Sequence, residues 1–212
     1  MDKQIKSSEK KELKILLLGD SGVGKTSIFH RYLKKKFEEN LTATIGADII
    51  TKEITYKNEP YKIHIFDTAG QERFRSVTTS YFHMSDYYFV VFDLTNKNSL
   101  DSIPHWLKQL KKEKENPKYI ILGNKDDIKK NQIPNEEINK TLENLGTVKF
   151  NKDNFLKVSA KSGKNIEEAF NYMIDIFNNN NVNTINENEE DNTTAKLDKK
   201  NLQKTNKNMK CC

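Results

Sequence analysis

A glycine-rich stretch at residues 19–26 constrains the fold of this chain more than any other feature. It matches the pattern of a phosphate-binding loop and reads Gly19-Asp20-Ser21-Gly22-Val23-Gly24-Lys25-Thr26. Glycines let the backbone wrap closely around phosphates, and N–H groups at a helix start form an anion nest. The apolar run 13–18 precedes this stretch, and apolar residues at helical spacing follow it. We therefore expect a strand, a phosphate-binding loop and a helix in this order, with the phosphate bound by the loop and the start of the helix.

Within this loop, each residue type has an expected task. Lys25 can reach the β- and γ-phosphates, and the Thr26 hydroxyl can ligate Mg²⁺. The remaining nucleotide-binding positions predicted around the phosphates are Ser21, Gly22, Val23, Gly24 and Ser27. This motif alone does not choose between ATP and GTP.

Short apolar runs alternate with helical stretches along the rest of the chain. We expect strands at 13–18, 45–56, 61–66, 87–92, 119–122 and 155–158, and helices at 25–35, 99–114, 135–145 and 165–177. A turn at 58–60 would join the second and third strands as a hairpin. The order predicts an α/β fold with a six-stranded, mostly parallel sheet, one antiparallel edge strand and helices on both faces. Ligands in such sheets bind beyond the carboxyl ends of the strands, where every motif falls.

Composition indicates one folded domain between two polar ends. Only 35% of residues are hydrophobic, and the apolar residues are scarce at both termini. We predict a flexible extension at 1–11, a domain at 12–177 and a disordered tail at 178–212. The two cysteines are the last two residues, so no disulfide framework is expected, which fits a reducing compartment. The net charge of +6 includes only three arginines; this favours a solvated lysine-rich surface, and no nucleic-acid partner is expected.

The stretch Asn124-Lys125-Asp126-Asp127 follows a predicted strand and points to the base. Guanine presents N–H donors at N1 and N2, which a carboxylate can accept, and the spacing assigns this role to Asp127. Alone the tetrad is a weak signal, because such charges are common in solvated loops; after a phosphate loop it becomes strong. Ser159, Ala160 and Lys161 follow the last strand and add support, since the Ala160 N–H can meet the guanine O6.

The stretch that begins at Asp67 supplies the groups expected around the γ-phosphate. Asp67 is placed to hold Mg²⁺ through water. Gly70 can bring its N–H to the γ-phosphate, and Gln71 can orient the attacking water. Without the phosphate loop, an ordinary aspartate at a strand end would be the better interpretation of Asp67.

In this order the motifs resemble a small G-domain of the Ras superfamily, closest to the Rab family. Residues 67–76 match the Rab switch II segment, residues 44–46 resemble its switch I, and the terminal Cys211-Cys212 is a common Rab ending. Several short stretches lean toward the late-endosomal Rabs: 43–48, 51–53 and 122–125.

The resemblance implies a switch that cycles between GTP and GDP and hydrolyses GTP slowly. Thr44 would give a hydroxyl to Mg²⁺ and an N–H to the γ-phosphate, and Phe37 would stack on guanine, although a core position is the alternative for Phe37. No arginine stands between Glu38 and Thr44, so an activating protein would supply an arginine finger. Exchange factors, effectors on switches I and II, an escort protein and a GDP-dissociation inhibitor are the other implied partners of a monomer.

The resemblance also implies a geranylgeranyl group on Cys211 and on Cys212, which would hold the chain on the cytoplasmic face of an endosomal or other vesicular membrane, with a cytosolic pool. Six lysines and one aspartate between 196 and 210 can add attraction to anionic lipid, or form a solvated linker. The sequence departs from the usual Rab pattern at Phe66, Ile49 and 82–86, which leaves partner choice open.

Two other functions compete with this interpretation. A phosphate-loop ATPase or small-molecule kinase would use Lys25 and Thr26 but leave residues 124–127 unexplained. A module that holds GTP permanently is disfavoured, because Gln71, Thr44 and Asp67 are all present.

Overall fold

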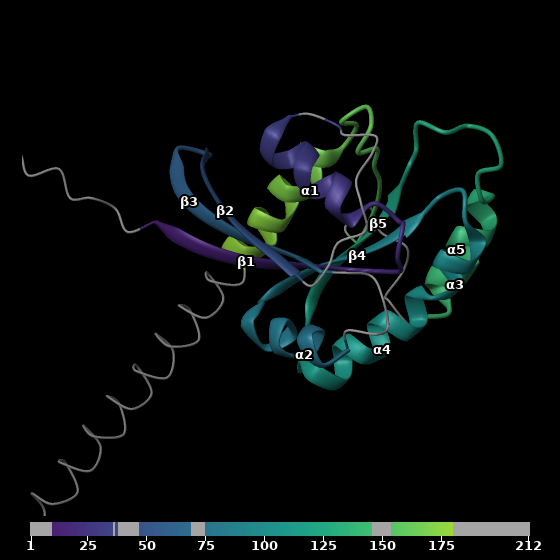
Figure 1. The fold of residues 1–212 in the computed structure, drawn as a ribbon, viewed down its shortest axis with the longest axis horizontal. Helices are drawn as coiled ribbons and strands as arrows, with labels where there is room; N and C mark the ends of the chain where they lie inside the picture. The colour runs from purple at the N-terminus through teal and green to yellow at the C-terminus, as the bar shows by residue number, and fades with distance from the viewer. Residues whose placement is uncertain (1–9, 36, 38–46, 69–74, 146–153, 180–212) are drawn as a thin grey trace, which may run out of the picture. The chain divides into compact units, whose positions relative to one another are not determined.

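Six strands form a single sheet in the computed structural model, which describes residues 10–35, 37, 47–68, 75–145 and 154–179. The strand order is β2-β3-β1-β4-β5-β6 (Figure 1). The strands are β1 (Lys11–Leu18), β2 (Ala47–Tyr56), β3 (Glu59–Thr68), β4 (Tyr87–Asp93), β5 (Lys118–Asn124) and β6 (Phe155–Lys157). Edge strand β2 is antiparallel to β3, and the other pairings are parallel. The predicted fold class is confirmed.

The chain divides into two compact units, Met1–Met173 and Ile174–Cys212, and the sheet lies in the first. The predicted boundaries after residues 11 and 177 stay predictions. In the second unit, the described residues 174–179 are helical.

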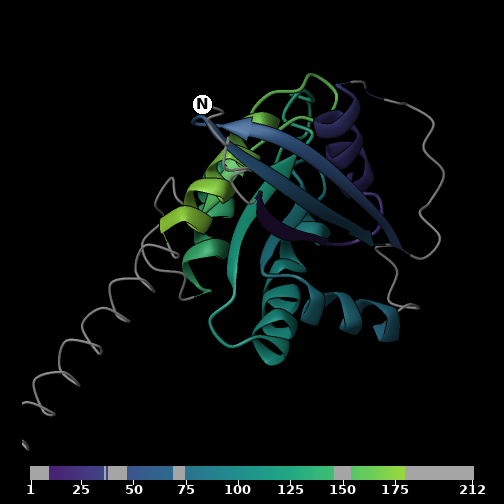
Figure 2. The ribbon, with the colours of Figure 1, turned by 90° about the vertical axis from the view of Figure 1, so that its left-hand side faces the viewer.

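Helices cover both faces of the sheet. One face carries α1 (Lys25–Lys34) and the helical residues 166–173; Figure 2 shows them behind the β2–β3 hairpin, which is drawn in blue. The Phe170 ring stacks on Tyr32 of α1 at 3.7 Å between centroids and meets Phe89 of β4 edge-on at 5.0 Å. The opposite face carries α2 (Arg75–Met84), α3 (Lys97–Asp101), α4 (Ile103–Glu113) and α5 (Asn135–Glu143).

Burial on both faces explains why the central strands are almost continuously apolar. In β1, Leu16 and Leu18 join the cluster that includes Leu107 and Leu110 of α4, and the alternate residues Ile15 and Leu17 are equally inaccessible. All seven residues of β4 are buried. The strand ends are therefore held by the core.

The helix predicted at 99–114 is two helices, and that prediction is wrong in this respect. Asn96 caps α3 by accepting a hydrogen bond from the N–H of Asn98, and α4 begins after Ser102. Pro104 causes the break, since it has no N–H for a helical bond and is tolerated only in a first turn.

The hairpin turn also lies earlier than the predicted 58–60. Lys57 and Asn58 both have positive φ angles, 48° and 64°, as a two-residue turn between twisted strands requires. Pro60 pairs with Thr55 in the β2–β3 ladder. It is accommodated there because pairing of β3 with β1 starts only at Tyr61.

Candidate functional site

The phosphate-loop motif connects β1 to α1 and depends on two glycines for steric reasons. Gly19 and Gly24 have φ angles of 139° and 94°. A Cβ at Gly19 would lie 2.2 Å from the Val91 carbonyl oxygen, and one at Gly24 would lie 2.3 Å from Asn124 Nδ2. A larger residue at Gly19 would have to move the backbone of β4, and one at Gly24 would have to displace the Asn124 side chain. Ser21 and Gly22 are exposed at the tip of the loop, and Val23 is buried.

Lys25, the first residue of α1, places its ammonium group inside the loop. The side chain is only 6% exposed, and Nζ donates to the carbonyl oxygens of Gly19 at 2.8 Å and Asp20 at 2.9 Å. Burial lowers the pKa of Lys25 to about 8, although the Asp67 and Asp20 carboxylates oppose this shift. The loop therefore holds an incompletely compensated cation, which a phosphate would stabilise.

Thr26 and Asp67 meet beside this lysine, as their proposed metal role requires. Parallel pairing of β1 with β3 sets Leu17 opposite Asp67, so the fully buried carboxylate lies next to the start of α1. The Thr26 hydroxyl donates to Asp67 Oδ2 at 2.6 Å. A hydroxyl and a carboxylate are oxygen ligands of the kind that Mg²⁺ prefers, so this donor pair fits the ion.

Asn124, the last residue of β5, links the phosphate loop to the loop after β6. Its side chain is 2% exposed; Nδ2 donates to the Val23 carbonyl at 2.9 Å, and Oδ1 accepts from the Ala160 N–H at 3.1 Å. The amide thus holds together segments that are far apart in the sequence. Because the Ala160 N–H is used here, contact with a guanine O6 would require this hydrogen bond to be shared or exchanged.

The two neighbouring aspartates have different surroundings. Asp126 is 5% exposed and forms ion pairs with Lys164 at 2.5 Å and Lys129 at 3.3 Å. Asp127 is exposed, and its Oδ1 accepts a hydrogen bond from the buried Ser159 hydroxyl at 2.6 Å. Ser159 therefore orients Asp127 and leaves the rest of its carboxylate accessible. Asp127, rather than Asp126, stays the predicted base acceptor.

Two further contacts at this site were not predicted from the sequence. Lys125 Nζ pairs with Asp93 Oδ2 of β4 at 2.6 Å, and the Trp106 ring N–H of α4 donates to Asp20 Oδ1 at 2.8 Å. The sequence motifs assign no role to Trp106 or to the Asp20 side chain. Asp20 and Trp106 are 86 positions apart, and no sequence pattern predicts a contact over such a separation. A single sequence therefore gives no signal for this hydrogen bond.

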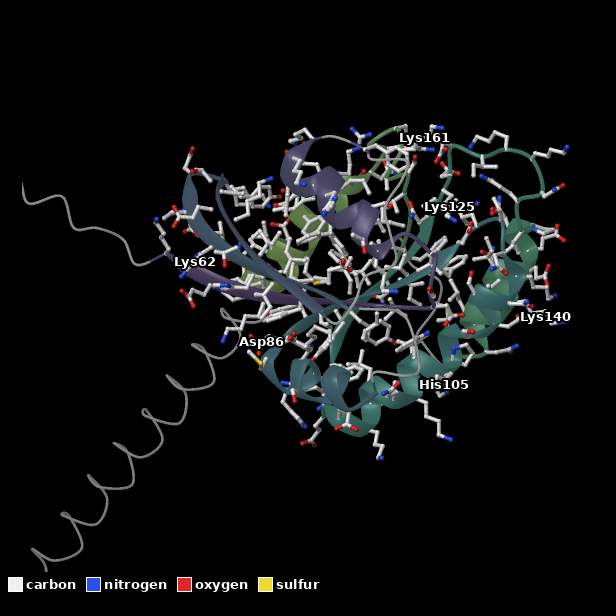
Figure 3. The ribbon with its side chains drawn as sticks, in the orientation of Figure 1. Lys62, Asp86, His105, Lys125, Lys140 and Lys161 are labelled. Carbon is white, nitrogen blue, oxygen red and sulfur yellow. The ribbon has the colours of Figure 1, made fainter. Side chains whose placement is uncertain are left out.

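The structure brings together most of the predicted site residues at one edge of the sheet. In Figure 3, Lys125 and Lys161 are labelled at the same end of the molecule, beyond the carboxyl ends of the strands. Ser27 lies in the first turn of α1, and Phe37 is half-buried. Five predicted residues lie outside the described part of the chain: Thr44, Gly70, Gln71, Cys211 and Cys212.

Comparisons with known proteins point to one family. The Ras family model matches residues 14–179. Ras-related protein Rab-31 of Mus musculus is 39% identical over 162 residues, which cover 76% of this chain and 80% of the mouse protein. Ras-related protein Rab-7a of Paramecium octaurelia is 36% identical over 171 residues, with 77% and 81% of the two chains covered.

The lowered pKa of Lys25 predicts a pH-dependent affinity for GDP. Above pH 8 the nucleotide-free protein loses the Lys25 proton, whereas bound phosphates favour the ammonium form and raise the pKa again. Binding then requires proton uptake, so affinity should fall by about fivefold between pH 8 and pH 9. Fluorescence of Trp106, the single tryptophan, provides the titration signal, since its ring contacts the loop.

Lys25→Arg is the matched control for this titration. Its guanidinium stays charged across this range, so any remaining pH dependence in this variant comes from other groups, including the base. An affinity for GDP that changes equally with pH in the wild type and in Lys25→Arg would contradict the prediction.

Proposed function

The chain belongs to the Rab family of Ras-type small GTPases, which hydrolyse GTP and act in vesicle trafficking, and from this premise we propose that it is a membrane-anchored switch. It alternates between an active GTP-bound state and an inactive GDP-bound state. The observation that carries the proposal is the Asn124 amide, which joins the phosphate loop to the segment proposed to face the base. One nucleotide can then contact both.

In this proposal the two ends of the nucleotide are recognised by different chemistry. The Lys25 ammonium and the loop N–H groups bind the β- and γ-phosphates. The exposed carboxylate of Asp127 accepts the N1 and N2 protons of guanine, and Phe37 stacks on the ring. Adenine offers no such pair of donors, so the site selects GTP and GDP.

Thr26, Asp67 and Thr44 would hold Mg²⁺, which supplies charge neutralisation at the phosphates when bound. Gln71 and the Thr44 carbonyl orient the attacking water, while Lys25 stabilises the charge that develops on the phosphates. Thr44 and the Gly70 N–H contact the γ-phosphate, so its loss releases both switch segments. No arginine lies between Glu38 and Thr44, and intrinsic hydrolysis is therefore slow.

Small GTPases of this family work with exchange factors, activating proteins and effectors. We place effector binding on the switch segments and the adjoining β2–β3 hairpin. Ile49 of β2 is 50% exposed there, whereas its cross-strand partner Phe66 is 3% exposed and packs against Tyr81 of α2. Of these two departures from the Rab pattern, Ile49 is thus the one that a partner can touch.

Membrane anchoring would come from the end of the chain. Within the described residues, no helix is long and apolar enough to cross a bilayer. Two prenyl groups give stable attachment where one is marginal, and the six lysines between 196 and 210 add attraction to anionic lipid. An escort protein and a GDP-dissociation inhibitor would handle the prenylated chain, which leaves a cytosolic pool beside an endosomal or other vesicular membrane.

Single-turnover hydrolysis of GTP tests the catalytic part of this proposal. Intrinsic turnover should be slow, and an activating protein with an arginine finger should raise it by about 10³- to 10⁵-fold. Gln71→Leu should slow hydrolysis by about tenfold or more, because water loses its orienting group, while GTP binding persists. Gln109→Leu, on α4, is the control and should match the wild type. Fast hydrolysis without any partner would contradict the proposal.

Mass spectrometry of the membrane-bound native protein tests the anchor. The C-terminal peptide should carry a geranylgeranyl group on Cys211 and another on Cys212. Replacing both cysteines by serine should move the protein to the soluble fraction. Unmodified cysteines on membrane-bound protein would refute this attachment.

A further inference from the structure

Arg31, in the last turn of α1, makes three hydrogen bonds to backbone carbonyl groups. Nε donates to Ala160 at 2.6 Å, Nη2 donates to Lys161, and Nη1 donates to Lys35 at 2.9 Å. Two of these acceptors belong to the loop proposed to face guanine. We propose that Arg31 is a positioning residue that fixes this loop against the base; the inference rests on the proposed function above.

The contact matches the shape of a guanidinium group. Its planar fork offers neighbouring N–H donors, which here reach the carbonyls of two consecutive residues, Ala160 and Lys161. The stem of the side chain passes near Gly163, since a Cβ there would be in ordinary van der Waals contact with Arg31 Cδ, at 3.6 Å. A lysine has a single ammonium centre and cannot reproduce this geometry.

Ala160 is consequently held from both sides. Its N–H donates to Asn124 Oδ1, and its carbonyl accepts from Arg31 Nε. The following turn is closed by its own bonds, from the Gly163 N–H to the Ser159 carbonyl and from the Ser162 N–H to the Ser159 hydroxyl. Arg31 anchors this closed turn to α1.

The same helix begins in the phosphate loop. Arg31 follows Lys25 by six residues, so about 9 Å of rigid helix separates the proposed phosphate contact from the base-loop contact. A helix that holds both ends sets the distance between them. Loss of Arg31 should therefore release the base end while Lys25 and the phosphate loop stay in place.

A purely structural role for Arg31 makes a different prediction. If the contacts only stabilise the fold, their loss should lower the melting temperature and accelerate release of every nucleotide equally. If they position the base loop, the loss should depend on a base atom that faces that loop. The 6-oxygen of guanine is that atom in the proposed site.

The test measures dissociation of two nucleotides, GDP and 6-thioguanosine diphosphate, which keeps the N1 and N2 protons but carries sulfur, a much weaker hydrogen-bond acceptor, in place of the 6-oxygen. Arg31→Ala should accelerate GDP release about 10- to 100-fold, as expected for hydrogen bonds from a charged donor. Release of the analogue should change by less than about threefold, since the coupling is lost when sulfur replaces the oxygen that faces the loop. Single-turnover hydrolysis of bound GTP should stay within about twofold of the wild type.

Two further variants complete the experiment. Arg31→Lys keeps the charge and should still release GDP fast, because the fork is lost; it replaces Arg31→Ala if that variant does not fold. Lys35→Ala is the matched control at the same helix end, since the Lys35 side chain pairs with Glu167 at 2.9 Å and its carbonyl remains available to Arg31. It should behave as the wild type.

The outcomes are separable. Unchanged GDP release in both Arg31 variants, or equal acceleration for both nucleotides, would overturn the positioning role. A wild-type chain that does not retain GDP at all would instead refute the proposed function on which the inference rests.

Discussion

The buried amide of Asn124 is the interaction on which the arrangement of the site depends. One side-chain group donates to the phosphate loop and accepts from the loop after β6, so it joins the ends of β1, β5 and β6. Loss of the amide would leave a buried carbonyl and a buried N–H without their partner, which costs more than the hydrogen bonds themselves contribute. The close approach exists because Gly24 has no side chain in the space that Asn124 occupies.

Around this link, charge is placed where a nucleotide needs it. Lys25 is buried at the phosphate end, and desolvation disfavours its ammonium form until an anion arrives. Asp20 is held by the Trp106 ring N–H, and Asp126 by Lys164 and Lys129, so these carboxylates have partners of their own. Asp127 is oriented by Ser159 yet remains exposed. The site therefore has the Lys25 cation at its phosphate end and the exposed Asp127 carboxylate at its base end.

The sequence predicts the features that depend on local pattern. Continuous apolar runs marked β1 and β4. The motif spacing placed Lys25 and Thr26 at the start of the helix after β1, and Asp67 and Asn124 at the ends of two other strands. The two wrong predictions have local causes. The predicted helix at 99–114 is divided by Pro104, although its apolar periodicity continues. The hairpin turn lies earlier than predicted because Lys57 adopts a positive φ, which lysine does not favour. Contacts such as Arg31 to Ala160 join residues 129 positions apart, and only the folded chain reveals them.

The central claim is a guanine-selective site at the carboxyl edge of the sheet, and competition between GDP and ADP for the nucleotide-free chain tests it most directly. Equilibrium binding in the presence of Mg²⁺ should favour GDP by about 10⁴-fold, because a site built to accept the guanine protons loses those hydrogen bonds with adenine. Affinities for GDP and ADP within about tenfold of each other would contradict the account.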